Sequence, residues 1–293
     1  MSQAIGRISG GIVWLLMQAS SLAFTQPTVG AMQLEKPTGV FEFRDAAVRG
    51  GTMTVRYCRP PTLHRNTRVI FVMHGSDPKT VEQACGLAEP YVTRLDAIVV
   101  APQFAGDAYP GDSYMFAGMV DGNGTATQKS QWGIAVIEHL FDALRRDLML
   151  TAGSYDIVGF SGGGQFVHRA VLCSPDARFR RAIAGSPSRY MLPTFSVRFP
   201  YGLDQAPVQT CDLARALGRE FILLLGDADT VDRVREDEAV TQGSNRFARG
   251  LRFFAIATEE ASKLGAALRW QLRIVHGVGH DPVAMVRAAL DLL

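Results

Sequence analysis

The chain has 293 residues, of which 47% are hydrophobic and 20% are charged. This composition excludes a disordered, collagen-like or coiled-coil chain, because apolar residues are abundant and no strict repeat is present. The 30 basic and 28 acidic side chains leave a net charge of +2 with no basic block, so no nucleic-acid partner is expected.

The first 31 residues differ in composition from the rest of the chain. Arg7 is the only ionisable side chain among them, and an apolar run from Ile12 to Met17 follows it. A basic start, a short apolar run and small residues near Ala23 and Ala31 are typical of a secretory signal peptide. The run is too short to span a bilayer comfortably. We expect export to the periplasm or out of the cell, with cleavage after residue 23 or 31 and no stable membrane insertion afterwards; an uncleaved anchor or a disordered terminus is the alternative.

Short β-branched runs alternate with helical patterns from about residue 40 to the end of the chain. The expected strands are Thr52–Cys58, Arg68–Met73, Ala97–Ala101, Tyr155–Phe160, Arg181–Ala184, Phe221–Leu225 and Arg269–His276. Apolar residues recur every three or four positions over 132–148 and 247–268, which predicts two amphipathic helices. The alternation predicts an α/β fold, with a mainly parallel central sheet and helices on both faces, in a single domain over residues 32–293.

The stretch at about residues 186–212, called the cap segment here, breaks this alternation. It holds four prolines and five aromatic or methionine side chains with no clear period, which predicts an irregular cap insertion over a site. Tyr190, Phe195 and Tyr201 are its candidate substrate-binding side chains. A cap buries such side chains against its own base as often as it presents them to a ligand.

Four cysteines, Cys58, Cys85, Cys173 and Cys211, lie after the signal segment. Their spacing includes no CxxC pair and no Cys/His cluster, so a zinc site is not expected. Disulfides can form in an exported protein, and the connectivity of these four stays open. The pair that flanks the cap segment, Cys173 and Cys211, is weakly favoured; an equal alternative is that the cysteines are small buried apolar side chains.

The strongest motif is Gly159-Phe160-Ser161-Gly162-Gly163, which lies between an expected strand and an expected helix. A serine on a sharp strand-to-helix turn adopts a strained backbone, and the residues two before and two after it must be small. The pattern therefore predicts Ser161 as a nucleophile. A dinucleotide-binding loop would need glycine in place of this serine, and a P-loop would need Gly-Lys-Ser/Thr.

A serine nucleophile needs a base and an acid that orients the base, and both follow later in the chain. Asp229 comes just after an expected strand, with Asp227 as the second choice and Asp232 as a further competitor. His280 lies on a glycine-rich loop before the last helix and is preferred to His276, which lies at a strand end. In a parallel sheet the catalytic groups lie at the edge formed by the carboxyl ends of the strands, where we expect both residues.

An earlier expected strand ends in His74-Gly75-Ser76. A loop at this position can present the backbone N–H of Ser76 beside the N–H of Gly162, which together would form an oxyanion hole. His74 is expected to have a structural role behind this loop.

These motifs together resemble the α/β-hydrolase superfamily, and especially its esterase and polyester-depolymerase-like members. The resemblance extends from about Val69 to Leu293 and rests on His74-Gly75, Gly-Phe-Ser161-Gly-Gly, Gly226-x-x-Asp229 and Gly279-His280. It implies a serine esterase with Ser161 as nucleophile, His280 as base and Asp229 as acid. The implied substrate is a small-molecule or oligomeric ester, and the implied mechanism needs no metal or cofactor.

Other functions share parts of this motif set. Serine peptidases and acyltransferases use the same catalytic residues, and a non-catalytic ligand-binding protein can have the same fold. A nucleotide-binding oxidoreductase is the least favoured interpretation. Acyl specificity, the preference for esters over amides and the oligomeric state are not determined by these residues.

The signal-peptide interpretation predicts the start of the mature protein. N-terminal sequencing of the exported chain is expected to begin between about residues 24 and 32, because signal peptidases cleave just after the small residues that end such segments. An exported protein that begins at Met1 would contradict it.

Overall fold

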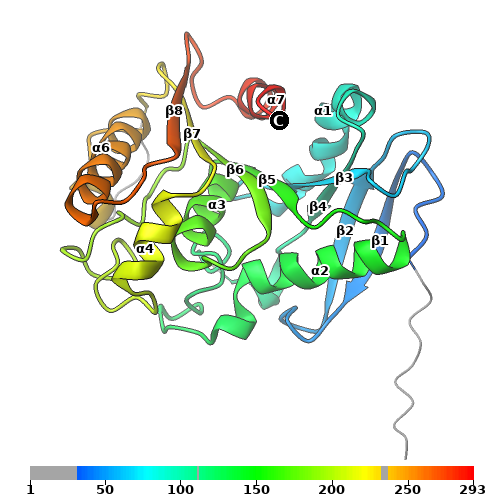
Figure 1. The fold of residues 1–293 in the computed structure, drawn as a ribbon, viewed down its shortest axis with the longest axis horizontal. Helices are drawn as coiled ribbons and strands as arrows, with labels where there is room; N and C mark the ends of the chain where they lie inside the picture. The colour runs from blue at the N-terminus through cyan, green and yellow to red at the C-terminus, as the bar shows by residue number, and fades with distance from the viewer. Residues whose placement is uncertain (1–31, 111, 232–236) are drawn as a thin grey trace, which may run out of the picture. The chain divides into compact units, whose positions relative to one another are not determined.

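The structure, a computed structural model, describes residues 32–110, 112–231 and 237–293. Met32–Leu293 forms one compact unit built around an eight-stranded sheet (Figure 1). The predicted signal peptide and its cleavage positions lie outside the described residues, as does Asp232. In the described part of the chain, no helix is both long enough and apolar enough to cross a membrane.

The sheet has the strand order β1-β2-β4-β3-β5-β6-β7-β8. β2 runs antiparallel to both of its neighbours, and all other neighbouring strands are parallel. The strands are β1 (Thr38–Arg44), β2 (Thr52–Cys58), β3 (Arg68–Met73), β4 (Ala97–Pro102), β5 (Tyr155–Phe160), β6 (Phe179–Gly185), β7 (Phe221–Gly226) and β8 (Trp270–Val275). Every residue of β4, β5 and β7 is buried, because a parallel sheet covered on both faces leaves no strand side exposed. The fold class predicted from the sequence is confirmed.

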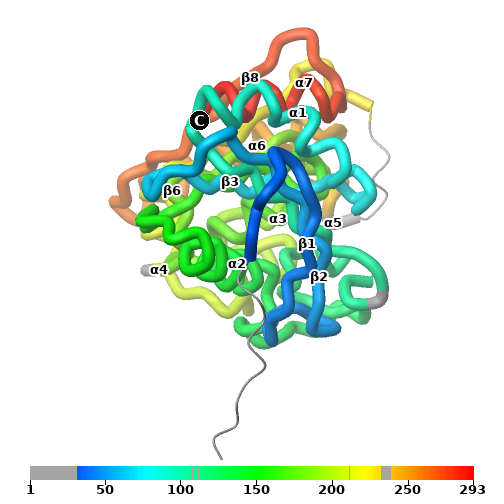
Figure 2. Tube along the Cα trace, turned by 90° about the vertical axis from the view of Figure 1, so that its right-hand side faces the viewer, coloured from blue at the N-terminus to red at the C-terminus, as the bar shows by residue number. Residues whose placement is uncertain are grey.

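Helices cover both faces of the sheet (Figures 1 and 2). They are α1 (Val81–Arg94), α2 (Gly133–Asp147), α3 (Gly162–Cys173), α4 (Thr210–Leu217), α5 (Asp237–Val240), α6 (Arg246–Leu264) and α7 (Pro282–Asp291). α1 and α7 pack on one face, whereas α2, α3, α4 and α6 pack on the other. Figure 2 turns β1 and β2 toward the viewer, with α1 and α7 above the sheet.

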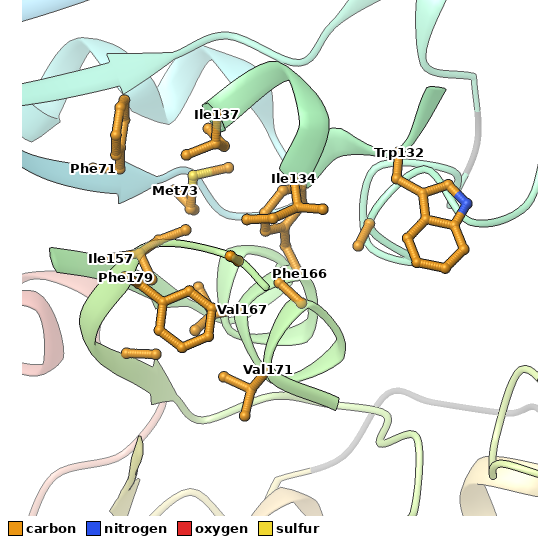
Figure 3. Close-up of a cluster of buried hydrophobic side chains, with 14 of the residues drawn as sticks. Phe71, Met73, Trp132, Ile134, Ile137, Ile157, Phe166, Val167, Val171 and Phe179 are labelled. Atoms are coloured by element: carbon orange, nitrogen blue, oxygen red, sulfur yellow. The ribbon is translucent and has the colours of Figure 1, made fainter. Parts of the chain in front are cut away.

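The side chains of β3 illustrate how one strand contributes to two cores. Phe71 and Met73 pack with Ile137 of α2 and Phe166 of α3 (Figure 3), whereas Val72 packs with α1 and α7 on the opposite face. Successive strand residues point to opposite faces, so an unbroken apolar run fills both layers. Each large side chain buried in this way stabilises the fold by roughly 1.5–3 kcal/mol.

The long helix α6 has well-defined ends, and its first turn borders the functional site. Asn245 precedes it as the N-cap, and its side chain accepts a hydrogen bond of 2.9 Å from the N–H of Ala248. The helix ends at Leu264 and is capped by Gly265, whose φ of 59° lies in the left-handed region where glycine is favoured. Phe253 and Ala257 bury its apolar stripe against the sheet.

Two sequence expectations are modified by the structure. β1 was not expected; as an edge strand it buries only Phe43, so its apolar pattern is weak. Cys173 is a free thiol whose Sγ lies 3.5 Å from Sδ of Met191, so it does not form the disulfide that the sequence weakly favoured; the side chain of Cys211 lies outside the described residues. Burial raises the pKa of the Cys173 thiol to about 12, as expected for a small apolar core side chain.

Candidate active site

Ser161 occupies the tight turn between β5 and α3. Its φ of 55° and ψ of −111° lie outside the regions that non-glycine residues normally adopt. Its N–H donates to the carbonyl oxygen of Gly185 at the end of β6, at 2.8 Å. Such strain costs on the order of 1–3 kcal/mol and persists only where the surrounding structure enforces it.

The flanking glycines are required because backbones touch at this turn. A Cβ placed on Gly159 would lie 2.2 Å from the carbonyl oxygen of Gly163, and one placed on Gly163 would lie 2.3 Å from the carbonyl oxygen of Met73. No side chain fits at either position. The two outer glycines of the Gly-x-Ser-x-Gly motif thus allow α3 to begin directly against β5 and β3.

His280 and Asp229 complete a hydrogen-bonded series with Ser161. The Nε2 atom of His280 lies 2.9 Å from the Oγ atom of Ser161, and its Nδ1 atom lies 2.7 Å from the Oδ2 atom of Asp229. His280 comes from the loop between β8 and α7, and Asp229 from the loop after β7. The Asp229 side chain is only 2% exposed. The structure therefore brings together the three residues that the sequence indicated.

The two loops that carry His280 and Asp229 are packed against each other. A Cβ on Gly226 would lie 2.2 Å from the carbonyl oxygen of Val278, and the N–H of Ala228 donates to the same oxygen at 3.1 Å. This close approach fixes the spacing between the imidazole and the carboxylate.

The competing residues Asp227 and His276 form a separate pair on the same loops. Nδ1 of His276 lies 2.9 Å from Oδ2 of Asp227, and the N–H of Gly277 donates to the other carboxylate oxygen at 2.7 Å. These hydrogen bonds lower the pKa of Asp227. The His276 side chain is 86% exposed, so this pair joins the loops at the surface and does not contact Ser161.

The backbone N–H groups of Ser76 and Gly162 are neighbours. A Cβ on Gly162 would lie 2.8 Å from the backbone nitrogen of Ser76. Within the described residues, neither N–H donates a hydrogen bond to another protein group. Gly162 is also the first residue of α3, where the helix dipole places partial positive charge. The arrangement can accept a negatively charged oxygen beside Ser161.

His74 fixes the direction of the Ser76 N–H. The N–H of Phe104 donates to Nε2 of His74 at 3.1 Å, so Nδ1 carries the ring proton and donates to the carbonyl oxygen of Gly75 at 2.7 Å. In a trans peptide the C=O and the following N–H point in opposite directions. Because His74 binds the Gly75 carbonyl, the Ser76 N–H points away from His74. The His74 ring is itself held by stacking on Tyr114, with ring centroids 4.1 Å apart.

The cap segment is irregular between β6 and α4, as expected. The prediction that Tyr190 binds substrate is wrong. Tyr190 is fully buried and packs against Phe253 with ring centroids 4.8 Å apart. Its backbone is held by the side chain of Gln242, so Tyr190 belongs to the core and does not face a ligand. Phe195 is 37% exposed, and Tyr201 packs edge-on against Phe116; their roles stay predictions.

One residue at the site was not indicated by the sequence. Nη1 of Arg246, the first residue of α6, lies 3.2 Å from Oδ1 of Asp229. The only sequence signal is its place after Asn245 at a helix start, and arginines in such positions are usually solvated. Among the residues that the structure describes, no three His, Cys, Asp or Glu side chains are grouped as metal ligands.

The fold and the Ser161–His280–Asp229 geometry can be compared with known proteins. No family model matches the chain, and no curated protein matches it either. Solved structures do match. Poly(aspartic acid) hydrolase-1 from Sphingomonas sp. KT-1 is 33% identical, with a TM-score of 0.84 over 88% of this chain and 99% of that chain. A poly(3-hydroxybutyrate) depolymerase from Bordetella parapertussis is 29% identical, with a TM-score of 0.81 over 87% of this chain and 88% of that chain.

A more distant structure, an S-formylglutathione hydrolase from Staphylococcus aureus, is 14% identical with a TM-score of 0.56 over 87% of this chain and 93% of that chain. It shows the shared fold alone. The nearer matches cover almost the whole of both chains at substantial identity. The chain belongs to the α/β-hydrolase family.

Replacing His74 by glutamine should make the fold less sensitive to acid. Burial lowers the pKa of His74 from 6.5 to about 4, so the unfolded chain binds this proton more tightly than the folded one. The fold therefore becomes less stable as the pH falls from 6.5 toward 4. Between pH 7 and pH 5, His74 lowers the free energy of unfolding by about 2 kcal/mol. In urea unfolding at these two pH values, the free energy of unfolding should fall less in His74→Gln than in the wild type, by this amount.

The comparison isolates His74 because other groups are common to both proteins. His168, whose pKa burial also lowers, contributes its own acid sensitivity to wild type and variant alike. Equal losses of stability in the two proteins would contradict the burial argument.

Proposed function

We propose that the chain is a serine hydrolase that cleaves carboxylic esters, with Ser161 as nucleophile, His280 as general base and Asp229 as the acid that orients the base. The observation that carries this proposal is the series of hydrogen bonds from Ser161 through His280 to Asp229, at 2.9 and 2.7 Å. Serine is a weak nucleophile on its own and is activated by a base at hydrogen-bond distance.

The proposed reaction has two halves. Ser161 Oγ attacks the ester carbonyl carbon while Nε2 of His280 takes the hydroxyl proton. The N–H groups of Ser76 and Gly162 stabilise the oxyanion that forms. The imidazolium then gives its proton to the departing alcohol, leaving an acyl-enzyme. Water, deprotonated by His280, then attacks the acyl carbon; the bond from this carbon to Ser161 Oγ breaks, the imidazolium returns its proton to Oγ, and the carboxylic acid leaves. No metal or cofactor is required.

Asp229 has two tasks in this scheme. Its carboxylate keeps the His280 proton on Nδ1, so that Nε2 is free to accept the proton of Ser161. Its negative charge also stabilises the imidazolium, and this attraction is strong because the carboxylate is buried and poorly screened by water.

The similarity to a poly(3-hydroxybutyrate) depolymerase supports an oligomeric ester as the substrate. A second candidate substrate is the amide-linked chain of a poly(aspartic acid), because a hydrolase named for that polymer is 33% identical to this chain. Both candidates use the same acyl-enzyme chemistry, and they differ in the leaving group. An acyltransferase would also share these residues and would pass the acyl group to an acceptor other than water.

We also propose that the protein is exported. The support is the composition of residues 1–31, with one basic side chain, a short apolar run and small residues before each candidate cleavage position.

A fluorophosphonate probe should label the wild-type protein and leave Ser161→Ala unlabelled, because the probe reacts with an activated serine hydroxyl. The same two proteins are then assayed on esters graded by acyl length, short polyester oligomers, matching amides and poly(aspartic acid). We expect ester turnover by the wild type only. Labelling or turnover that survives the substitution would refute the role of Ser161, and absence of turnover across the whole panel would favour a binding protein.

Gly162→Ala tests the oxyanion site. The added Cβ would lie 2.8 Å from the nitrogen of Ser76 and 2.9 Å from the carbonyl carbon of Gly75, so the loop must move. Losing one oxyanion donor costs about 3 kcal/mol of barrier, so kcat should fall by about a hundredfold with little change in KM. Gly86→Ala, a helix position with open space around the new Cβ, is the control. A kcat for Gly162→Ala equal to that of the control would argue against this site.

A further inference from the structure

We propose that Arg246 is a positioning residue for the reaction: its guanidinium holds the Asp229 carboxylate in the orientation that aligns His280 with Ser161. This inference rests on the function proposed above. It assigns a role to a side chain that approaches the catalytic series from α6, at the end remote from Ser161.

The contacts divide the Asp229 carboxylate between two partners. Oδ2 lies 2.7 Å from Nδ1 of His280, while Oδ1 lies 3.2 Å from Nη1 of Arg246. With one oxygen bound on each side, the carboxylate plane resists rotation about its Cβ–Cγ bond. The orientation of the imidazole follows from this plane, because its Nδ1–H must point at Oδ2.

Burial makes the charge of Arg246 important. The Asp229 side chain is 2% exposed and that of Arg246 is 13% exposed, so water contributes little to the stability of the carboxylate. A buried carboxylate whose main partner is a neutral imidazole lacks charge compensation in the resting enzyme. The guanidinium supplies that compensation without taking the oxygen that His280 uses.

Arg246 is itself anchored. The same Nη1 donates to the carbonyl oxygen of Val231 at 2.7 Å, which ties the loop after Asp229 to the helix. The backbone N–H of Phe247 donates to the main-chain oxygen of Asp229 at 3.4 Å. The first turn of α6 therefore donates hydrogen bonds to both the main chain and the side chain of Asp229.

The rest of α6 makes this support rigid. The helix runs for 19 residues, is capped by Asn245 and buries Phe253 in the core. A side chain on a well-packed helix holds its position more accurately than one on a loop. Because Arg246 acts on the carboxylate and not on the ester, its loss should affect the chemical step and not substrate binding.

The test compares Arg246→Met, which removes the charge and keeps much of the side-chain length, with Arg246→Lys, which keeps a charge. Arg252→Met is the control: Arg252 lies on the same helix, is exposed, and its Nη1 donates to the carbonyl oxygen of Thr241 at 3.3 Å. For each variant, kcat and KM are measured on an ester that the wild type cleaves. The rate of fluorophosphonate labelling of Ser161 reports nucleophile activation separately, and thermal unfolding reports folding.

A misplaced catalytic group typically costs about tenfold to a hundredfold in rate, so Arg246→Met should lose that much in kcat and in labelling rate, with KM unchanged. Arg246→Lys should fall between the wild type and Arg246→Met, and Arg252→Met should equal the wild type. In a third variant at this position, Arg246→Ala, millimolar methylguanidinium should partly restore kcat, whereas Ser161→Ala should stay inactive under the same conditions. A folded Arg246→Met with wild-type kcat, or with a change in KM alone, would overturn the inference.

If Arg246→Met does not fold, Arg246→Lys decides, because one ammonium does not reproduce the geometry of the guanidinium at Asp229 and Val231. A lower kcat with unchanged KM supports the inference, and a wild-type kcat overturns it. Failure of the proposed function has a different signature, namely labelling and turnover that persist in Ser161→Ala.

Discussion

The arrangement of the site depends on backbone contact at the start of α3. Gly159, Gly162 and Gly163 each face backbone atoms at distances where a Cβ fits only if the backbone moves, so this helix begins almost in contact with β5 and with the loop after β3. The strain at Ser161 follows from this proximity, and it is maintained because every residue of α3 is buried. The same contact places the N–H of Gly162 beside that of Ser76. The placement of the Ser161 hydroxyl and of these two N–H groups therefore derives from a single packing constraint.

Parallel pairing carries that constraint across the sheet. β5, β6, β7 and β8 are successive neighbours in the same direction, so their carboxyl ends lie along one edge. Ser161, Asp229 and His280 each follow one of these strands, and residues far apart in the chain meet without a long excursion. The close fit of Gly226 against Val278 then sets the last spacing. The outer pair Asp227 and His276 ties the same loops at the surface.

What the sequence predicts well is what a local pattern determines. The buried strands are unbroken apolar runs, and the serine turn requires glycines at fixed positions, so both can be recognised within a few residues. Tyr190 could not be placed, because an aromatic side chain in an irregular segment has no periodicity that tells core from ligand. Arg246 was missed because its partner lies 17 positions earlier in the chain, and only the packing of α6 brings them together. β1 was not predicted because an edge strand buries few side chains and so shows only a weak apolar pattern.

The two histidines of the site differ in environment, and the difference explains their separate roles. His74 is buried between Tyr114 and the backbone, both of its ring nitrogens are engaged, and its pKa is lowered to about 4, so it stays neutral and keeps one tautomer. A ring in that state can orient a peptide group but has no free lone pair with which to take a proton from a serine.

His280 is partly exposed, and its Nε2 faces Ser161. One imidazole thus sets the direction of the Ser76 N–H, while the other, held through Asp229 by Arg246, is directed at the hydroxyl.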